Sequence, residues 1–183
     1  MIVYIAGTEY SPTYKSFEIY VQGCSRHCPG CHNPETWEFM KPETQVDAQE
    51  FLTQQKVKTD KFDNMVKRIY VTGGDVLCSP VWAERFSCMA RTMWPTKELW
   101  LFTGAEQEDI PGWVWKYYDV VKCGPYDKTK RQANLFPASS NQKLIFNGTP
   151  VRYIEGPFDE LPPIIHPVTV ELVDFRGEVI WKR

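Results

Sequence analysis

Residues 68–103 have the sequence RIYVTGGDVLCSPVWAERFSCMARTMWPTKELWLFT, which predicts a strand, a helix and a second strand in succession. The first strand, 68–72, is rich in β-branched and aromatic residues and stops at two glycines. Ser79 suits the N-cap of the helix and Pro80 its first turn, and the helix ends before Pro95. Its apolar residues form one stripe at helical spacing: Trp82, Phe86, Met89, Ala90 and Met93. This order of elements favours two parallel strands of one sheet.

The same alternation extends to both sides of this stretch. Further strands are predicted at 17–22 and 119–122, further helices at 43–57 and near 109–117, and a polar connector at 56–64. Together these elements predict an α/β fold built on a parallel sheet. A closed (β/α)8 barrel needs about 250 residues, with a minimum near 200, whereas this core has roughly 150. We therefore expect an open, partial (β/α) barrel.

The C-terminal part of the chain has a different composition. Residues 155–167 are rich in proline and are expected to form a linker. Residues 168–173 and 178–181 then predict a β-hairpin that turns at 176–177. The sequence contains no internal repeat. We therefore expect a core domain over 1–154, with 155–183 appended to it as a linker and a hairpin.

The overall composition is that of an ordinary globular protein. The 183 residues are 43% hydrophobic, 14% aromatic and 24% charged, which excludes disordered and fibrous classes. With 21 basic and 23 acidic residues the formal net charge is -2, so no positive field attracts nucleic acid. The short basic cluster at 128–131 is expected to be a solvated loop. Neither a signal peptide nor a membrane-spanning segment is predicted, so we expect a cytoplasmic protein that uses no membrane.

Six cysteines in a reducing compartment suggest metal binding or catalysis rather than disulfides. Three of them lie in the run 22–37, QGCSRHCPGCHNPETW, at C-x3-C-x2-C spacing. Cys24, Cys28 and Cys31 are therefore the candidate metal ligands and catalytic residues, since thiolates are favoured ligands of iron. Three ligands leave one iron of a 4Fe-4S cluster without a cysteine and open to another molecule.

Two other kinds of metal site fit the same cysteines. A structural zinc site would need His27 or His32 as its fourth ligand, but His32 adjoins Cys31 and is poorly placed to complete a tetrahedron. A fully cysteine-ligated electron-transfer cluster would need a fourth cysteine from elsewhere in the chain. The three candidates are Cys78, Cys88 and Cys123. We expect these three to be small buried hydrophobic side chains instead.

A second motif, Val-Thr-Gly-Gly-Asp, occupies 71–75. It places two glycines and a carboxylate at the predicted end of a strand, where α/β barrels build their active sites and glycine lets the backbone approach a ligand closely. Taken alone, Gly-Gly-Asp is also a common turn.

Together, the cysteine spacing and this motif about forty residues later resemble the radical S-adenosylmethionine superfamily. The resemblance implies that the methionine amino and carboxylate groups of S-adenosyl-L-methionine chelate the open iron. Reductive cleavage of the cofactor then yields a 5'-deoxyadenosyl radical. It also implies that Asp75 contacts the methionine amino group. The cofactor-binding residues that it implies are Gly30, Cys31, His32, Asn33, Gly73, Gly74 and Asp75. For Asn33 a turn role before Pro34, and for His32 a surface or core position, are equally consistent with the sequence.

The wider string 21–37 and the downstream segments 99–104, 119–126 and 139–143 resemble the activating enzymes of anaerobic (class III) ribonucleotide reductase. This resemblance implies an oxidoreductase that makes a glycyl radical on the large catalytic subunit of that reductase. A glycine loop of the reductase would enter the open side of the barrel, and a flavodoxin or ferredoxin would serve as electron donor. The alternatives are a small radical enzyme that acts on a metabolite, as in deazaguanine synthesis, or a non-catalytic metal-binding module.

Overall fold

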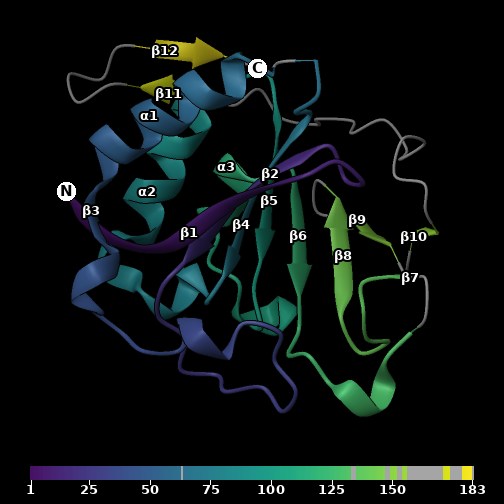
Figure 1. Ribbon diagram of the computed structural model, residues 1–183. Coiled ribbons are helices and arrows are strands. Elements are labelled where there is room, and N and C mark those ends of the chain that lie inside the picture. The colour runs from purple at the N-terminus through teal and green to yellow at the C-terminus, as the bar shows by residue number, and fades with distance from the viewer. Residues whose placement is uncertain are drawn as a thin grey trace.

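The computed structural model describes residues 1–62, 64–132, 135–146, 149–151, 154–155, 171–173 and 179–182. Eight strands form one sheet in the order β3-β1-β2-β4-β5-β6-β8-β9 (Figure 1). These strands are β1 (Ile2–Ser11), β2 (Ser16–Val21), β3 (Gln45–Asp47), β4 (Arg68–Gly73), β5 (Glu98–Phe102), β6 (Val120–Cys123), β8 (Lys143–Phe146) and β9 (Thr149–Val151). Two short strands, β7 (Leu135–Phe136) and β10 (Ile154–Glu155), pair with each other beside the sheet.

The centre of the sheet is parallel, and its outer strands are not. Strands β2, β4, β5 and β6 are parallel neighbours, which confirms the alternation predicted for this part of the chain. By contrast, β1 runs antiparallel to β2 and β8 antiparallel to β6, so the prediction of a parallel sheet was wrong for the edges. Only residues 12–15 join β1 to β2, and parallel pairing requires a crossover of about a dozen residues or more. The longer segment between β6 and β8 contains, among its described residues, only the 3-10 turn η5 (Lys128–Lys130) and the short strand β7, and no α-helix.

The first predicted helix was misplaced by several residues. It begins at Ala48 rather than at 43, because Asp47 caps it by accepting hydrogen bonds from the backbone N–H groups of Gln49 and Glu50. The preceding residues form the 3-10 turn η2 (Pro42–Thr44) and strand β3. Helix α1 (Ala48–Asp60) also extends into the predicted connector, where Lys56 pairs with Asp60 one turn later.

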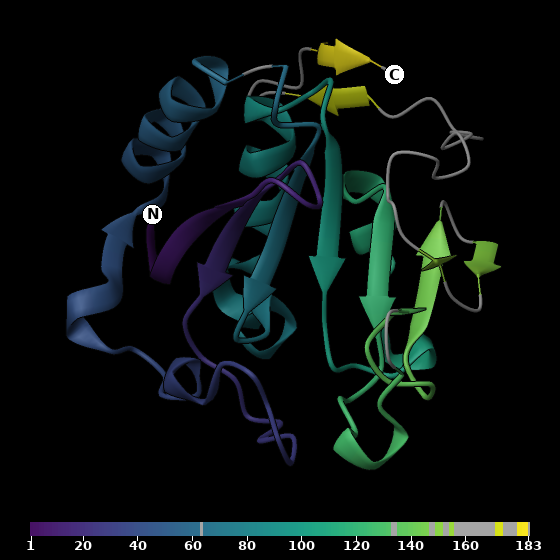
Figure 2. The same cartoon turned by 45° about the vertical axis from the view of Figure 1, so that its right-hand side comes forward.

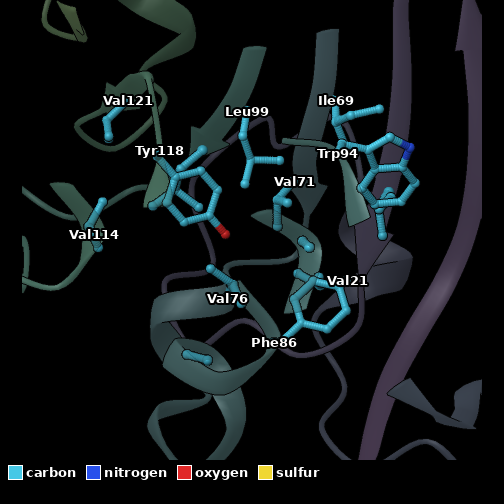
Figure 3. Packing of buried hydrophobic residues seen from close by; sticks show 14 of the residues in the cluster. Val21, Ile69, Val71, Val76, Phe86, Trp94, Leu99, Val114, Tyr118 and Val121 are labelled. Carbon is cyan, nitrogen blue, oxygen red and sulfur yellow. The ribbon is translucent and has the colours of Figure 1, made fainter. Parts of the chain in front are cut away.

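The three α-helices of the described chain pack on one face of the sheet. Helix α2 (Pro80–Met93) begins and ends close to its predicted limits, and its residues Trp82 and Phe86 are buried. Figure 3 shows Phe86 close to Val21 and Val76, with Leu99 and Val71 from the neighbouring strands above them. The short helix α3 (Val114–Tyr117) follows the turn η4 (Gln107–Asp109), within the range where a helix was predicted.

The opposite face of the central strands carries a second, smaller cluster. It is formed by strand residues whose side chains alternate with those of the main core: Tyr70, Trp100, Val120, Leu144 and Phe146. Tyr14, Phe102 and Phe136 pack against this cluster. An aromatic surface therefore lines the face of the sheet away from the helices.

The C-terminal strands β11 (Glu171–Val173) and β12 (Val179–Lys182) form an antiparallel pair that is separate from the main sheet. This pairing confirms the two strands of the predicted hairpin. The turn at 176–177 and most of the predicted linker lie outside the described residues. In the part of the chain that is described, no helix has the length and apolar character needed to cross a lipid bilayer.

Candidate functional site

A pocket of about 380 Å³ lies at the carboxyl ends of the parallel strands. The arrowheads of β4, β5 and β6 point to the same end of the sheet, and the cysteine-bearing loop after β2 lies there too (Figure 2). Of the residues predicted from the sequence, the pocket brings together Cys24, Cys28, Cys31, His32, Asn33, Gly73, Gly74 and Asp75. Gly30 is not among the lining residues. Gly30 has a φ of +77°. A Cβ added to it would lie 3.1 Å from Cδ of the Lys128 side chain.

Backbone and side-chain hydrogen bonds shape the cysteine loop. The N–H groups of Gly23 and Cys24 donate to the carbonyls of Thr36 and Trp37, at 2.8 and 3.1 Å. The buried Gln22 amide donates to two further carbonyls of the same segment, those of Glu35 and Glu38. The second half of the motif, Asn-Pro-Glu-Thr-Trp, thus folds back to hold the first cysteine in place.

The three motif cysteines fit an iron-sulfur cluster by their chemistry. All three are free thiols that line the same pocket; Cys24 is buried, while Cys28 and Cys31 are half-buried. Among the described residues, no three His, Cys, Asp or Glu side chains converge closely enough for a single metal ion. A 4Fe-4S cluster takes its thiolates on three different irons, so its ligands surround a volume rather than a point.

The two glycines of the second motif allow β4 to end against the cysteine loop. A Cβ on Gly74 would lie 2.6 Å from the carbonyl oxygen of Gly23, and Gly73 has a φ of +91°. The N–H groups of Gly74 and Asp75 donate to the carbonyls of Val21 and Gly23, at 2.8 and 3.1 Å. In this structure the close approach for which glycine was expected is therefore made by the protein's own backbone.

Asp75 is a buried carboxylate with four hydrogen-bond donors. It is 2% exposed, and its Oδ2 accepts from Thr103 Oγ1 at 2.8 Å and from Gly104 N at 3.0 Å. The same oxygen forms an ion pair with Arg26, and Oδ1 accepts from Leu77 N. Asp75 therefore joins the cysteine loop to the ends of β4 and β5. Sequence reasoning missed Arg26 and Thr103, although Arg26 lies inside the cysteine motif.

Lys122 is a further residue of the pocket wall that the sequence reasoning missed. It lies in β6 between apolar residues, and its Nζ is 5.1 Å from the centroid of the Phe102 ring. Burial lowers the pKa of Lys122 to about 8, although Cys28 and Asp75 act in the opposite direction. The sequence signal that could have identified Lys122 is a lysine inside an otherwise apolar predicted strand.

The remaining three cysteines lie in different environments. Cys123 is buried in the main core, as expected, but Cys78 and Cys88 are only half-buried, which corrects that prediction for both. Cys78 ends the turn η3 (Val76–Cys78) and accepts a hydrogen bond from Ser25 Oγ at 3.4 Å. The neighbouring Cys78 thiol and burial raise the pKa of Cys24, whereas the neighbouring Cys24 and Ser25 lower the pKa of Cys78.

The segment 139–143 supports the rim of the pocket. Asn141 Nδ2 donates to the carbonyl of Pro125 at 2.8 Å, and Gln142 Nε2 donates to the carbonyl of Gly124 at 3.1 Å. These bonds hold the loop after β6. In this loop the centroid of the Tyr126 ring lies 5.2 Å from the centroid of the His32 ring.

Comparison with known proteins indicates the same class of protein as the cysteine pocket does, an iron-sulfur protein. A family model described as a 4Fe-4S single cluster domain matches residues 15–145. The anaerobic ribonucleoside-triphosphate reductase-activating protein of Enterobacteria phage T4 is 31% identical over 135 residues, which cover 70% of this chain and 82% of that protein. The protein of that name in Escherichia coli K12 is 26% identical over 132 residues, which cover 68% of this chain and 83% of that protein. A pyruvate formate-lyase-activating enzyme of Staphylococcus aureus USA300 is 30% identical over 67 residues, 37% of this chain and 27% of that enzyme.

The fold and the pocket of three thiols thus define an iron-sulfur protein. More particularly, the chain belongs to the 4Fe-4S single cluster domain family and, within it, to the anaerobic ribonucleoside-triphosphate reductase-activating proteins. The resemblance found in the sequence motifs is therefore confirmed.

Proposed function

We propose that this protein activates anaerobic ribonucleotide reductase by making a glycyl radical on its catalytic subunit. It is a radical S-adenosylmethionine oxidoreductase with one 4Fe-4S cluster. The observation that carries the proposal is the single pocket lined by all three motif cysteines and by Gly73, Gly74 and Asp75. Relatives named for this activity, similar over about 70% of the chain, support it.

The chain's own residues have distinct roles in this proposal. Cys24, Cys28 and Cys31 hold the cluster, and Asp75 receives the methionine amino group at the wall of the pocket. When bound, the reduced cluster supplies the electron that cleaves S-adenosyl-L-methionine to the 5'-deoxyadenosyl radical. His32 and Asn33, which line the pocket, lie beside the cofactor in this proposal. Gly30 does not line the pocket, and its proposed part is to shape the backbone that leads into Cys31.

The face away from the helices is proposed to admit the glycine loop of the reductase. Phe102, Phe136 and Tyr14 belong both to the aromatic cluster of this face and to the wall of the pocket. The sheet order is linear, with β3 and β9 at its two edges in the described chain. This open arrangement supports the proposal of an open, partial (β/α) barrel. An open side suits a macromolecular substrate better than a small metabolite.

The proposed setting is the cytoplasm, with a flavodoxin or ferredoxin as electron donor. Its support is chemical: the six cysteines are free thiols, and a cluster with an open iron needs a reducing compartment. A low-potential one-electron carrier matches the single electron that the reaction consumes.

The test is to mix the reduced protein, S-adenosyl-L-methionine and the matching reductase without air, and to record the electron paramagnetic resonance spectrum. We expect a doublet that collapses when the α-hydrogen of the reductase glycines is replaced by deuterium. Formation of 5'-deoxyadenosine without this signal would favour the metabolite-acting alternative. Absence of both products would favour a non-catalytic metal-binding module.

The ligand set is tested separately by iron content. After anaerobic reconstitution we expect about four irons per chain. The variants Cys24→Ala, Cys28→Ala and Cys31→Ala should each lose the cluster and the cleavage of the cofactor. The matched controls Cys88→Ala and Cys123→Ala should retain both. An active Cys28→Ala variant would contradict the assignment.

A further inference from the structure

Arg26 occupies the carboxylate that the proposed function assigns to the cofactor. In the structure its Nε pairs with Oδ2 of Asp75, and both residues line the pocket. We infer that Arg26 and the ammonium group of S-adenosyl-L-methionine are alternative partners of Asp75, so that the arginine leaves the carboxylate when the cofactor binds and thereby limits the affinity for the cofactor. The inference rests on the cofactor role proposed for Asp75.

The carboxylate oxygen that pairs with Arg26 has no capacity for a further donor. Oδ2 accepts from Arg26 Nε, from Thr103 Oγ1 at 2.8 Å and from Gly104 N at 3.0 Å. An ionised carboxylate has about two lone-pair sites on each oxygen, so these three donors already fill it. An ammonium added beside the guanidinium would also place two positive charges on one oxygen, where they repel each other. One of the present donors must therefore leave when the ammonium binds this oxygen.

Arg26 is the donor that is able to leave. Leu77 and Gly104 donate to the carboxylate through backbone N–H groups. The Thr103 hydroxyl is fixed as well, because its oxygen accepts from Ala105 N at 3.0 Å. Arg26 donates through a flexible side chain that is 30% exposed. Rotation of this side chain therefore opens Oδ2 without any movement of the strand ends.

The exchange of one cation for the other lowers the affinity for the cofactor. Asp75 is 2% exposed, and a buried carboxylate needs a cation or other strong donors beside it. The free energy needed to separate the Arg26 pair is therefore subtracted from the free energy gained when the ammonium binds. Gly104 makes room for the arginine in its present position, because a Cβ on Gly104 would overlap Cδ of Arg26.

Equilibrium titration of the cluster-loaded, full-length protein with S-adenosyl-L-methionine tests this competition. Arg26→Met removes the guanidinium and keeps an unbranched side chain over Gly104, so we expect binding to be roughly five- to tenfold tighter than in the wild type. The matched control is Lys128→Met, which removes an exposed positive charge beside Gly30 that does not line the pocket. Its affinity should change by less than about twofold, because exposed charges are largely screened.

A cofactor analogue that lacks the methionine amino group identifies the competing group. This analogue cannot replace the guanidinium at Asp75, so wild type and Arg26→Met should bind it equally within about twofold. Thermal unfolding gives a second readout: Arg26→Met should have the lower midpoint without S-adenosyl-L-methionine, and saturating cofactor should remove most of the difference. Arg26→Gln keeps a neutral donor and should show the same changes at smaller size, which provides a second variant if Arg26→Met does not retain its cluster.

Three results would overturn the inference. Unchanged or weaker cofactor binding by both Arg26 variants, with Asp75→Asn still weaker than wild type, would show that guanidinium and ammonium bind the carboxylate together. Equal tightening in Lys128→Met, or for the analogue without the amino group, would show that Arg26 acts through the overall charge of the pocket and not through Asp75. Unchanged affinity of Asp75→Asn would overturn the proposed cofactor role of Asp75 as well, so the two failures are distinguishable.

Discussion

At the scale of single residues, Asp75 has more partners than a turn residue needs. Its carboxylate binds Arg26, Thr103, Gly104 and Leu77 at the wall of the pocket. These contacts fix the junction between the cysteine loop and the strand ends, and in the proposed function the same carboxylate also binds the cofactor's ammonium. A substitution that keeps the shape and removes the charge separates the two.

We therefore predict that Asp75→Asn weakens the binding of S-adenosyl-L-methionine by roughly ten- to a hundredfold, because a charge-assisted hydrogen bond contributes about 1.5–3 kcal/mol. Iron content should not change. Equilibrium titration of the cluster-loaded variant measures the effect. Thr103→Val removes a neutral bond to the same oxygen and should have a smaller effect. If Asp75→Asn binds the cofactor with unchanged affinity, the Gly-Gly-Asp motif has only a structural role as a turn.

Lys122 gives a prediction about pH. Burial lowers its pKa in the folded protein to about 8, from an ordinary value of 10.5. Between these values the unfolded chain binds more protons than the folded one, so this lysine's penalty on folding is fully present below about pH 8 and disappears as the pH rises to about 10.5. Lys122→Met should therefore stabilise the cluster-free protein by about 1–3 kcal/mol at pH 7.

This difference between variant and wild type should shrink steadily above pH 8. Urea unfolding of both proteins at pH 7, 9 and 10.5 measures it, and the comparison cancels the titration of all other groups. A difference that does not vary with pH would show that the lysine reaches solvent.

At the scale of elements, a buried ion pair joins α2 to the strands that carry the pocket. Arg91 Nη2 lies 2.6 Å from Asp119 Oδ2, and both residues are almost completely buried. Asp119 also accepts a hydrogen bond from Leu99 N, and Arg91 Nε donates to the carbonyl of Tyr117. The pair therefore determines how α2 sits against β5 and the start of β6.

We predict that Arg91→Met destabilises the protein by about 3–5 kcal/mol, because it removes the positive charge that pairs with a buried carboxylate. Denaturant unfolding of the cluster-free protein measures the loss. Arg85→Met lies on the same helix in an exposed position and should change stability by less than about 0.5 kcal/mol. Equal stabilities of the two variants would mean that the interior rearranges to solvate Asp119.

At the scale of the whole molecule, the described strands form a continuous eight-stranded sheet and two separate pairs, β7–β10 and β11–β12. Among the described residues, those that line the pocket all precede position 143. That a core over 1–154 carries the activity and that 155–183 is an appendage stays a prediction.

Removal of residues 156–183, which keeps β10, should therefore leave iron content and the formation of 5'-deoxyadenosine unchanged. Iron analysis and product chromatography on the shortened protein check this expectation, and circular dichroism verifies that it folds. A folded, cluster-loaded protein that cannot cleave the cofactor would show that the tail belongs to the active domain.

The sequence by itself determined the ligand chemistry and the central strands of this protein. Cys24, Cys28 and Cys31 lie within eight residues of one another, so one loop is sufficient to bring them to one pocket. The strand–helix–strand pattern around Gly73 likewise depends on local periodicity. Only the tertiary structure decided the antiparallel edge strands, the Arg26–Asp75–Thr103 junction and the position of Lys122. Each of these depends on which distant segments become neighbours, and the pattern of residues along a single segment does not encode that.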